Sequence, residues 1–189
     1  MLSSRRYDVA GFLSEEDLPF IKNSWAIFPY EDTLKDLLTA IKFHKKRWLI
    51  DAFDKSIRDA SQIVTSEDTF DAIIPIPLSL SKTIEREFNQ AEIIGRKFSE
   101  STRIPLLSRS LRKPHSSISQ SQLGMQEREA HLYGVFSVRN PRQVAGKTIL
   151  LVDDIITTGA TAREAARALT KAGAKSVSLF TLARTELKK

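Results

Sequence analysis

Two acidic residues, Asp153 and Asp154, stand just before a group of hydroxyl-bearing and glycine residues, and the two groups favour complementary chemistry. Adjacent carboxylates accept hydrogen bonds from sugar hydroxyls or bind a metal ion, but they repel a phosphate placed directly on them. The second group offers hydroxyls, a glycine that lets backbone N–H groups approach a ligand, and the start of a helix, which together form a phosphate cradle. Its members are Thr157, Thr158, Gly159, Ala160 and Thr161. A ligand with a phosphate at one end and a diol nearby, such as ribose 5-phosphate, satisfies both groups.

An α/β fold with a mainly parallel sheet is expected to position these residues. Residues 148–152 are apolar at every position after the first, as in a strand that is buried on both faces. A helix is expected over 161–172, with Gly173 as its C-terminal stop, and a further strand over 176–182. Strand, loop, helix and strand in this order form a βαβ unit. In open α/β sheets, ligands bind beyond the carboxyl ends of the strands, which is where the acidic pair and the cradle are expected.

The rest of the chain predicts further elements of the same class. Apolar residues at helical spacing between 33 and 60 predict one long helix or two abutting helices. Residues 108–131 are polar and lack apolar periodicity, which is typical of a functional or disordered loop. The first 29 residues suggest no architecture. The remaining expected elements are strands at 71–75, 103–107 and 135–138 and a helix at 88–101.

The composition excludes several classes of function. The chain has no cysteine, so disulfides, thiolate nucleophiles and cysteine-based zinc sites are absent from it. No apolar run approaches the roughly 20 residues that cross a bilayer, and no apolar segment follows the basic start as in a signal peptide. We therefore expect a cytoplasmic protein without a membrane partner. The net charge of +6 and the pI near 9.6 fit a polyanionic ligand, either a small phosphate compound or nucleic acid, and equally a basic surface without a ligand.

The stretch 149–161 reads four apolar residues, two acids, two apolar residues and then Thr-Thr-Gly-x-Thr. This pattern resembles, without a substitution, the 5-phosphoribosyl-1-pyrophosphate (PRPP) signature of type I phosphoribosyltransferases. The resemblance implies their fold and the binding of PRPP or a ribose 5-phosphate nucleotide, with Asp153 and Asp154 as the catalytic pair. It also implies Mg²⁺ that is carried with PRPP and not by direct protein ligands. The alternative interpretation is an ordinary strand–helix connection with a helix cap and surface acids.

Upstream, Pro75-Ile76-Pro77-Leu78 is followed by Lys82, Arg86 and Phe88-Asn89-Gln90-Ala91. These residues resemble the Pro-x-Pro-Leu … Arg-Gly-Phe-Asn-Gln-Ala signature of the ComF (GntX-like) family, whose phosphoribosyltransferase-like members are tied to competence and DNA utilisation. Further matches follow in the same order at Leu111-Arg112, Gln120 with Leu123, Arg128 and Gly134-Val135-Phe136.

The chain departs from this family at three places. Glu87 replaces the usual glycine and His131 the usual asparagine. Residues 1–29 show nothing like the usual N-terminal four-cysteine zinc module, so functions that rest on that module are not expected from them. We therefore expect an N-terminal segment of unassigned architecture at 1–29 and a phosphoribosyltransferase-like domain at 30–189.

The resemblance also implies roles for three upstream groups. The turn formed by Pro75, Ile76, Pro77 and Leu78 would be the pyrophosphate loop, with a plain strand end as the alternative. Lys82 and Arg86 would add charge that assists the departure of pyrophosphate, with solvated surface charges as the alternative. Residues 108–131 would form a flexible loop that closes over the site and excludes water, with an unstructured linker as the alternative. The residues of interest in this loop are Arg109, Arg112, Lys113, Gln120 and Arg128.

Two classes of function follow from these observations. The first is an enzyme that transfers the phosphoribosyl group from PRPP to an unidentified nitrogen nucleophile with Mg²⁺, which requires mostly positioning and charge stabilisation. The second is a non-catalytic PRPP-binding accessory or regulatory protein that contacts single-stranded DNA or a competence helicase through its basic surface. A homo-oligomer is compatible with either.

Overall fold

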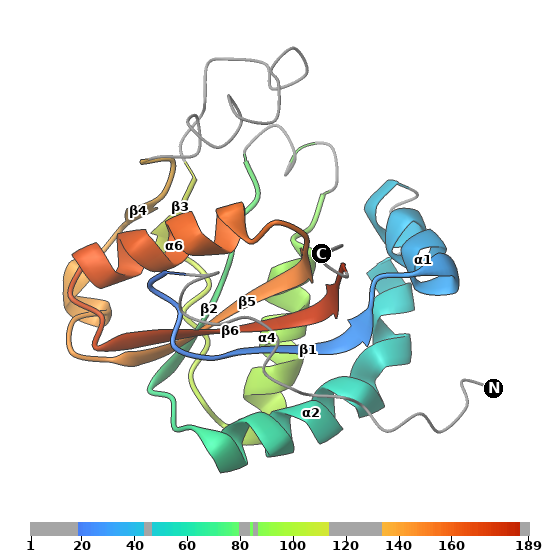
Figure 1. Ribbon diagram of the computed structural model, residues 1–189, viewed down its shortest axis with the longest axis horizontal. Coiled ribbons are helices and arrows are strands. Elements are labelled where there is room, and N and C mark those ends of the chain that lie inside the picture. Colours follow the sequence, from blue (N-terminus) through green and yellow to red (C-terminus); the bar gives the residue numbers. More distant parts are fainter. Residues whose placement is uncertain (1–18, 44–46, 80–83, 85–86, 114–133, 186–189) are drawn as a thin grey trace.

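A computed structural model describes residues 19–43, 47–79, 84, 87–113 and 134–185. Four strands form one sheet in the order β1-β6-β5-β2, in which every neighbouring pair is parallel, and β3 and β4 form a separate antiparallel pair (Figure 1). The predicted α/β class with a mainly parallel sheet is confirmed. The elements are β1 Ser24–Pro29, α1 Asp32–Phe43, the 3-10 helix η1 Arg47–Phe53, α2 Asp54–Glu67, β2 Ala72–Pro75, α4 Gln90–Thr102, β3 Leu111–Arg112, β4 Ser137–Val138, the 3-10 helix η3 Pro141–Gln143, β5 Thr148–Ile156, α6 Ala160–Lys171 and β6 Ser176–Arg184.

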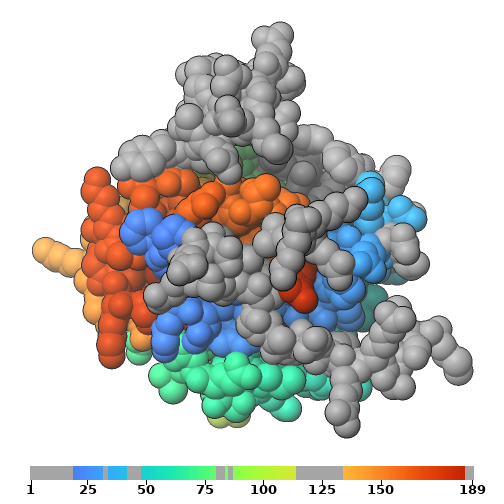
Figure 2. Space-filling model, viewed as in Figure 1, coloured from blue at the N-terminus to red at the C-terminus, as the bar shows by residue number. Residues whose placement is uncertain are grey.

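Helices lie on both faces of the main sheet (Figure 1), and an apolar core lies on each side of it. Leu150 and Val152 of β5 pack in one core with residues of α2 and α4, while Ile149 and Leu151 pack in the other core with residues of α6. All four side chains are fully buried, which explains why this run is apolar without alternation. The space-filling view shows a band of orange atoms from the region of β5 and α6 across one face of the molecule (Figure 2). The outer side of α6 therefore reaches the surface, and its inner side covers the sheet.

The two central strands are longer than the sequence predicted. β5 continues from the expected end at residue 152 to Ile156, and β6 continues to Arg184, because their C-terminal segments pair with each other. β2 ends earlier, with Pro75 opposite Val152. The expectation that the chain leaves the strand at residue 152 is therefore wrong, and the acidic pair belongs to the last part of β5. In that part β5 has β6 on one edge and extends beyond β2 on the other.

The N-terminal strand was not predicted from the sequence. β1 pairs in parallel with β6, so the main sheet begins before residue 30. Trp25 is only 1% exposed, and its indole N–H donates to a carboxylate oxygen of Glu67 at 2.8 Å. Trp25 also makes an edge contact with the ring of Phe70. These contacts join the sheet edge to the C-terminal end of α2.

The remaining expectations are confirmed in part. The helical stretch expected from 33 to 60 consists of α1, η1 and α2, and the expected helix at 88–101 is α4. Residues 103–107 do not form a strand and contribute one isolated bridge, between Leu106 and Ile73 of β2. The segment expected as a loop from residue 108 contains β3, which pairs with β4, and its residues 114–131 lie outside the described part of the chain.

Candidate functional site

The connection from β5 to α6 forms a tight turn onto a helix N-terminus. Gly159 occupies the N-cap position with φ 74°, a conformation that glycine adopts without steric cost. The Thr158 hydroxyl accepts a long hydrogen bond from the Ala160 N–H, at 3.4 Å. The next N–H groups, of Thr161 and Ala162, belong to the first helical turn, where no acceptor exists within the helix. The turn therefore presents backbone donors and the positive end of the helix dipole, as the sequence predicted for a phosphate cradle.

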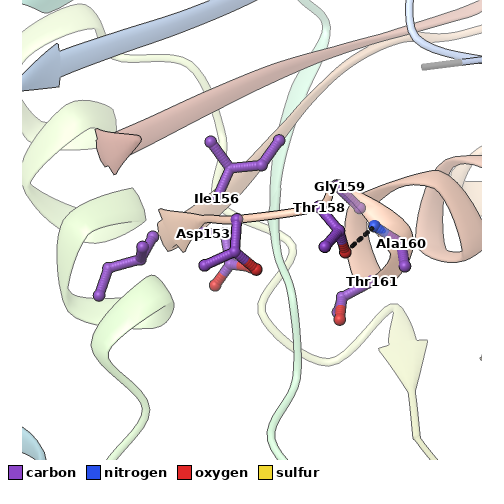
Figure 3. Close-up of a pocket in the computed structure, with 9 residues that line it drawn as sticks. Asp153, Ile156, Thr158, Gly159, Ala160 and Thr161 are labelled. Carbon is purple, nitrogen blue, oxygen red and sulfur yellow. Dashed lines mark hydrogen bonds between the residues drawn. The ribbon is translucent and has the colours of Figure 1, made fainter. Parts of the chain in front are cut away.

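A pocket lies at this turn and includes one member of the acidic pair. Figure 3 shows the Asp153 carboxylate and the Thr161 hydroxyl pointing to the same side of the connection, with the Ile156 side chain on the opposite side. Asp154, the next residue along the strand, does not line the pocket. The lining residues are Asp153, Ile155, Ile156, Thr157, Thr158, Gly159, Ala160, Thr161 and Ala162.

Both carboxylates are held by backbone hydrogen bonds. Oδ1 of Asp153 accepts from the N–H of Asp154 at 2.8 Å, and Oδ1 of Asp154 accepts from the N–H of Ile155 at 2.8 Å. Both residues are half-buried. These bonds orient both carboxylates before any ligand binds.

The acidic pair offers the oxygen ligands that Mg²⁺ takes in proteins. Across the described ranges, no group of three or more His, Asp or Glu side chains is placed to hold a metal ion. An Mg²⁺ ion usually keeps several waters and takes only one or two carboxylates together with substrate phosphates. The acidic pair fits that limited role, so these residues are compatible with an ion that arrives with a diphosphate.

The turn after β2 is tied to the start of α4 by Asn89. The Asn89 amide N–H donates to the carbonyl oxygen of Ile76 at 2.9 Å, and its Oδ1 caps α4 by accepting from the N–H of Ala91 at 3.1 Å. The Ile76 N–H in turn donates to the carbonyl of Val152 in β5 at 2.8 Å. The predicted pyrophosphate loop therefore lies at the same edge of the sheet as the acidic pair. Its predicted cations, Lys82 and Arg86, lie outside the described residues.

The described part of the predicted flexible loop, residues 108–113, contributes to a basic ribbon, defined here as residues 109–113 together with β4 and Arg139. Arg109, Arg112 and Arg139 are exposed, and the Arg139 N–H donates to the carbonyl of Ser110 at 2.8 Å. The Lys113 ammonium lies over the ring of Phe136, 5.4 Å from its centroid. The other predicted loop residues, Gln120 and Arg128, fall outside the part of the chain that the structure describes.

Glu164 links Gly134, which precedes β4, to α6 and was not found from the sequence. This buried carboxylate accepts from the N–H of Gly134 at 3.1 Å and from the Arg167 guanidinium at 3.1 Å. The spacing of Glu164 and Arg167 on a helix predicts their pairing. The contact with Gly134 joins residues 30 positions apart, and no local pattern indicates it.

Comparison with known proteins gives consistent family matches. Residues 52–188 match the family model described as the phosphoribosyl transferase domain. Competence protein ComFC of Bacillus subtilis (strain 168) is 32% identical over 170 residues, which cover 89% of this chain and 67% of that protein. Competence protein F of Haemophilus influenzae is 29% identical over 163 residues, covering 82% and 69%. The DNA utilization protein YhgH of Escherichia coli (strain K12) is 26% identical over 159 residues, covering 82% and 69%.

Solved structures of phosphoribosyltransferase type are also similar. The glutamine PRPP amidotransferase from B. subtilis complexed with ADP and GMP shares 21% identity at a TM-score of 0.42, covering 68% of this chain and 26% of that one. The purine phosphoribosyltransferase from Pyrococcus horikoshii shares 16% identity at a TM-score of 0.44, covering 70% of this chain and 82% of that one.

Within the described residues, no helix is long and apolar enough to cross a membrane.

Proposed function

The chain belongs to the phosphoribosyl transferase domain family and is ComF-like within it, and from this premise we propose that it binds PRPP at the β5–α6 connection. In this proposal the 5-phosphate lies against the N–H groups at the start of α6. The ribose hydroxyls donate to Asp153 and Asp154, and the diphosphate extends toward the turn after β2. Mg²⁺ binds with the diphosphate.

One observation carries the proposal: the Asp153 carboxylate and the first turn of α6 line a single pocket. A helix N-terminus favours an anion, whereas a carboxylate disfavours one and accepts from hydroxyls. A ligand that places an anion and a hydroxyl a few ångströms apart is therefore favoured over a simple phosphate or a simple sugar. A ribose 5-phosphate group has both.

If the protein turns PRPP over, its residues act mainly by positioning. The bond between the anomeric carbon and the diphosphate oxygen breaks, and the diphosphate leaves with the electron pair. A bond from that carbon to a nitrogen of the acceptor forms, and the nitrogen loses a proton to solvent. The acidic pair fixes the ribose and favours positive charge that develops on the ring. Mg²⁺, when bound, neutralises the departing diphosphate.

Ligand-induced stabilisation tests this proposal. A ligand at 100 times its Kd stabilises the folded state by about 2.7 kcal/mol. For a chain of this size that corresponds to a rise in Tm of about 5–11 °C. We expect such a rise with Mg²⁺–PRPP, and a rise with ribose 5-phosphate, but none with ribose alone. A folded sample whose Tm does not change at millimolar PRPP would contradict the proposal.

The basic ribbon favours a second candidate function, binding of single-stranded DNA. In the described stretches 101–113 and 134–152 there are seven Lys or Arg residues and no Asp or Glu. A run of cations without acids is suited to a phosphate backbone, and such binding is largely independent of base sequence and weakens as salt rises. In this second candidate, a competence helicase is a protein partner of the same surface.

A charge-matched pair of variants tests the second candidate. Replacing Arg112 and Arg139 together with Ser removes two cations from the ribbon. Replacing Lys35 and Lys55 together with Ser removes two cations from α1 and α2 instead. By counterion release, two lost phosphate contacts reduce the slope of log K against log salt by about 1.4. We expect that reduction for the ribbon variant only, in a fluorescence-anisotropy titration of an oligonucleotide. Equal effects of the two variants, or no binding at low salt, would contradict a DNA surface on the ribbon.

A further inference from the structure

Gln90, the first residue of α4, has a buried side-chain amide nitrogen without a hydrogen-bond partner. The residue is 2% exposed, and its Nε2 has no partner in the structure. Buried side-chain amides are nearly always hydrogen-bonded, so this donor calls for an explanation. Among the described residues, two other buried polar atoms also lack a hydrogen-bond partner, the hydroxyl oxygens of Ser24 and Ser178. Ser24 begins β1 and Ser178 is the third residue of β6, so both lie away from the carboxyl edge of the sheet.

The position of Gln90 at the carboxyl edge follows from its neighbours. Asn89 donates to the carbonyl of Ile76, directly after the end of β2, and so fixes the start of α4 at this edge. Gln90 shares one helix face with Ile94 and Phe98, because residues four apart lie above one another. Ile94 and Phe98 pack in the core with Leu150 and Val152 of β5. Gln90 therefore continues this apolar row one turn closer to the edge where β5 ends.

On β5, the residues that face this core are followed by Asp154 on the same side of the strand. Leu150, Val152 and Asp154 occupy alternate positions and so share a face of the strand. Beyond Val152, β5 extends past the end of β2, so β2 does not pair with that edge of the strand there. A ribose held at the end of β5 with its 5-phosphate at α6 directs its anomeric substituent away from α6. In that arrangement the substituent extends toward the turn after β2 and the start of α4.

We propose that Gln90 is a ligand-binding residue whose amide N–H donates to a diphosphate oxygen of PRPP, an inference that rests on the proposed function. A donor without an acceptor is complementary to a group that only accepts hydrogen bonds, and diphosphate oxygens are such a group. The ribose hydroxyls need acceptors, which the acidic pair supplies. Binding of the diphosphate satisfies the buried amide, so the unpaired donor costs stability in the unliganded protein and contributes affinity in the complex.

The variant Gln90→Leu separates this role from a structural one, because leucine has a similar volume and no polar atom. Binding is measured by calorimetry for Mg²⁺–PRPP and for ribose 5-phosphate, which lacks the diphosphate. We expect the affinity for PRPP to fall about tenfold or more, as for a lost bond to a charged group. The affinity for ribose 5-phosphate is expected to stay within about twofold, and the Tm of the unliganded protein to stay equal or rise. Gln90→Met serves as a second variant if the first does not fold.

Ser178→Ala is the matched control, because it removes another unpaired buried polar atom away from the edge. It is expected to leave both affinities unchanged. Two outcomes overturn this inference alone, provided that the unaltered chain binds both ligands. In the first, Gln90→Leu lowers the affinities for PRPP and ribose 5-phosphate equally. In the second, it leaves the affinity for PRPP unchanged. If the unaltered chain binds neither ligand, the proposed function fails, and the inference falls with it.

Discussion

Replacing Asp153 with asparagine changes one atom of the pocket in a defined way. Oδ1 of Asp153 accepts from the N–H of Asp154 at 2.8 Å, and only the oxygen of an asparagine amide can keep that bond. The amide nitrogen therefore takes the place of the other carboxylate oxygen, which is expected to face the ribose. A charged acceptor becomes a neutral donor at the position where a ribose hydroxyl donates.

The size of the effect follows from the loss of one hydrogen bond to a charged group. Such a bond contributes about 1.5–3 kcal/mol, and each 1.4 kcal/mol corresponds to a factor of ten in Kd. We expect Asp153→Asn to weaken ribose 5-phosphate binding by about 10- to 100-fold. Asp154→Asn is expected to weaken binding by less, because Asp154 does not line the pocket. Without ligand, each variant is expected to be as stable as the unaltered chain or slightly more stable, since repulsion within the pair is relieved.

Isothermal titration calorimetry with ribose 5-phosphate measures this directly, with thermal melting of the unliganded variants beside it. Asp59→Asn is a suitable control, because Asp59 lies on α2 and pairs with Lys55 at the surface. Its binding affinity is expected to be unchanged. If both site variants bind as tightly as the unaltered chain, the carboxylates do not hold the ribose. If instead they unfold, the pair has a structural role that the hydrogen bonds do not indicate.

Two further predictions concern the turn and the helix packing. Gly159→Ala and Gly146→Ala each place a side chain at positive φ, 74° and 73°, and each is expected to lower the stability by about 1–2 kcal/mol in melting experiments. Only Gly159→Ala is expected to weaken ribose 5-phosphate binding. Equal binding by the two variants would contradict a phosphate at this turn. Burial lowers the pKa of Lys97, but its hydrogen bonds to Asp51 and Asp54 raise that pKa by more, so the net shift is a rise. The stabilising effect of the charged Lys97 is therefore present below pH 10 and is lost as pH rises through the raised pKa. Lys97→Met is expected to cost about 0.5–1 kcal/mol at pH 8, because the carboxylates are well exposed. The difference from the unaltered chain should shrink in melts as the pH rises through the raised pKa of Lys97. A difference that stays constant over that rise would show that the loss is one of packing.

Local patterns in the sequence predicted the elements that build the site. The apolar run before Asp153 predicted a buried strand, and Gly173, at φ 92°, is the predicted stop of α6. The acidic pair misled the prediction of the strand end, because polar residues at the end of an apolar run are typical of a loop. Here the pairing of Ile155 with Ala183 continues the strand, and this pairing depends on the length of a strand far along the chain.

The contacts that complete the site depend on tertiary structure and were not predictable. Asn89 belongs to a recognised motif, but its bond to the carbonyl of Ile76 requires the turn after β2 to lie beside α4. The unpaired amide of Gln90 is a property of its surroundings and not of its spacing. The strand β1 was missed for a related reason, since its partner, β6, lies at the other end of the chain.

A crystal structure of the chain with ribose 5-phosphate tests the central claim most directly. The account predicts the phosphate within hydrogen-bond distance of the N–H groups that open α6, and the ribose hydroxyls against Asp153. A ligand phosphate bound elsewhere, for example on the basic ribbon, with the β5–α6 turn empty, would contradict it.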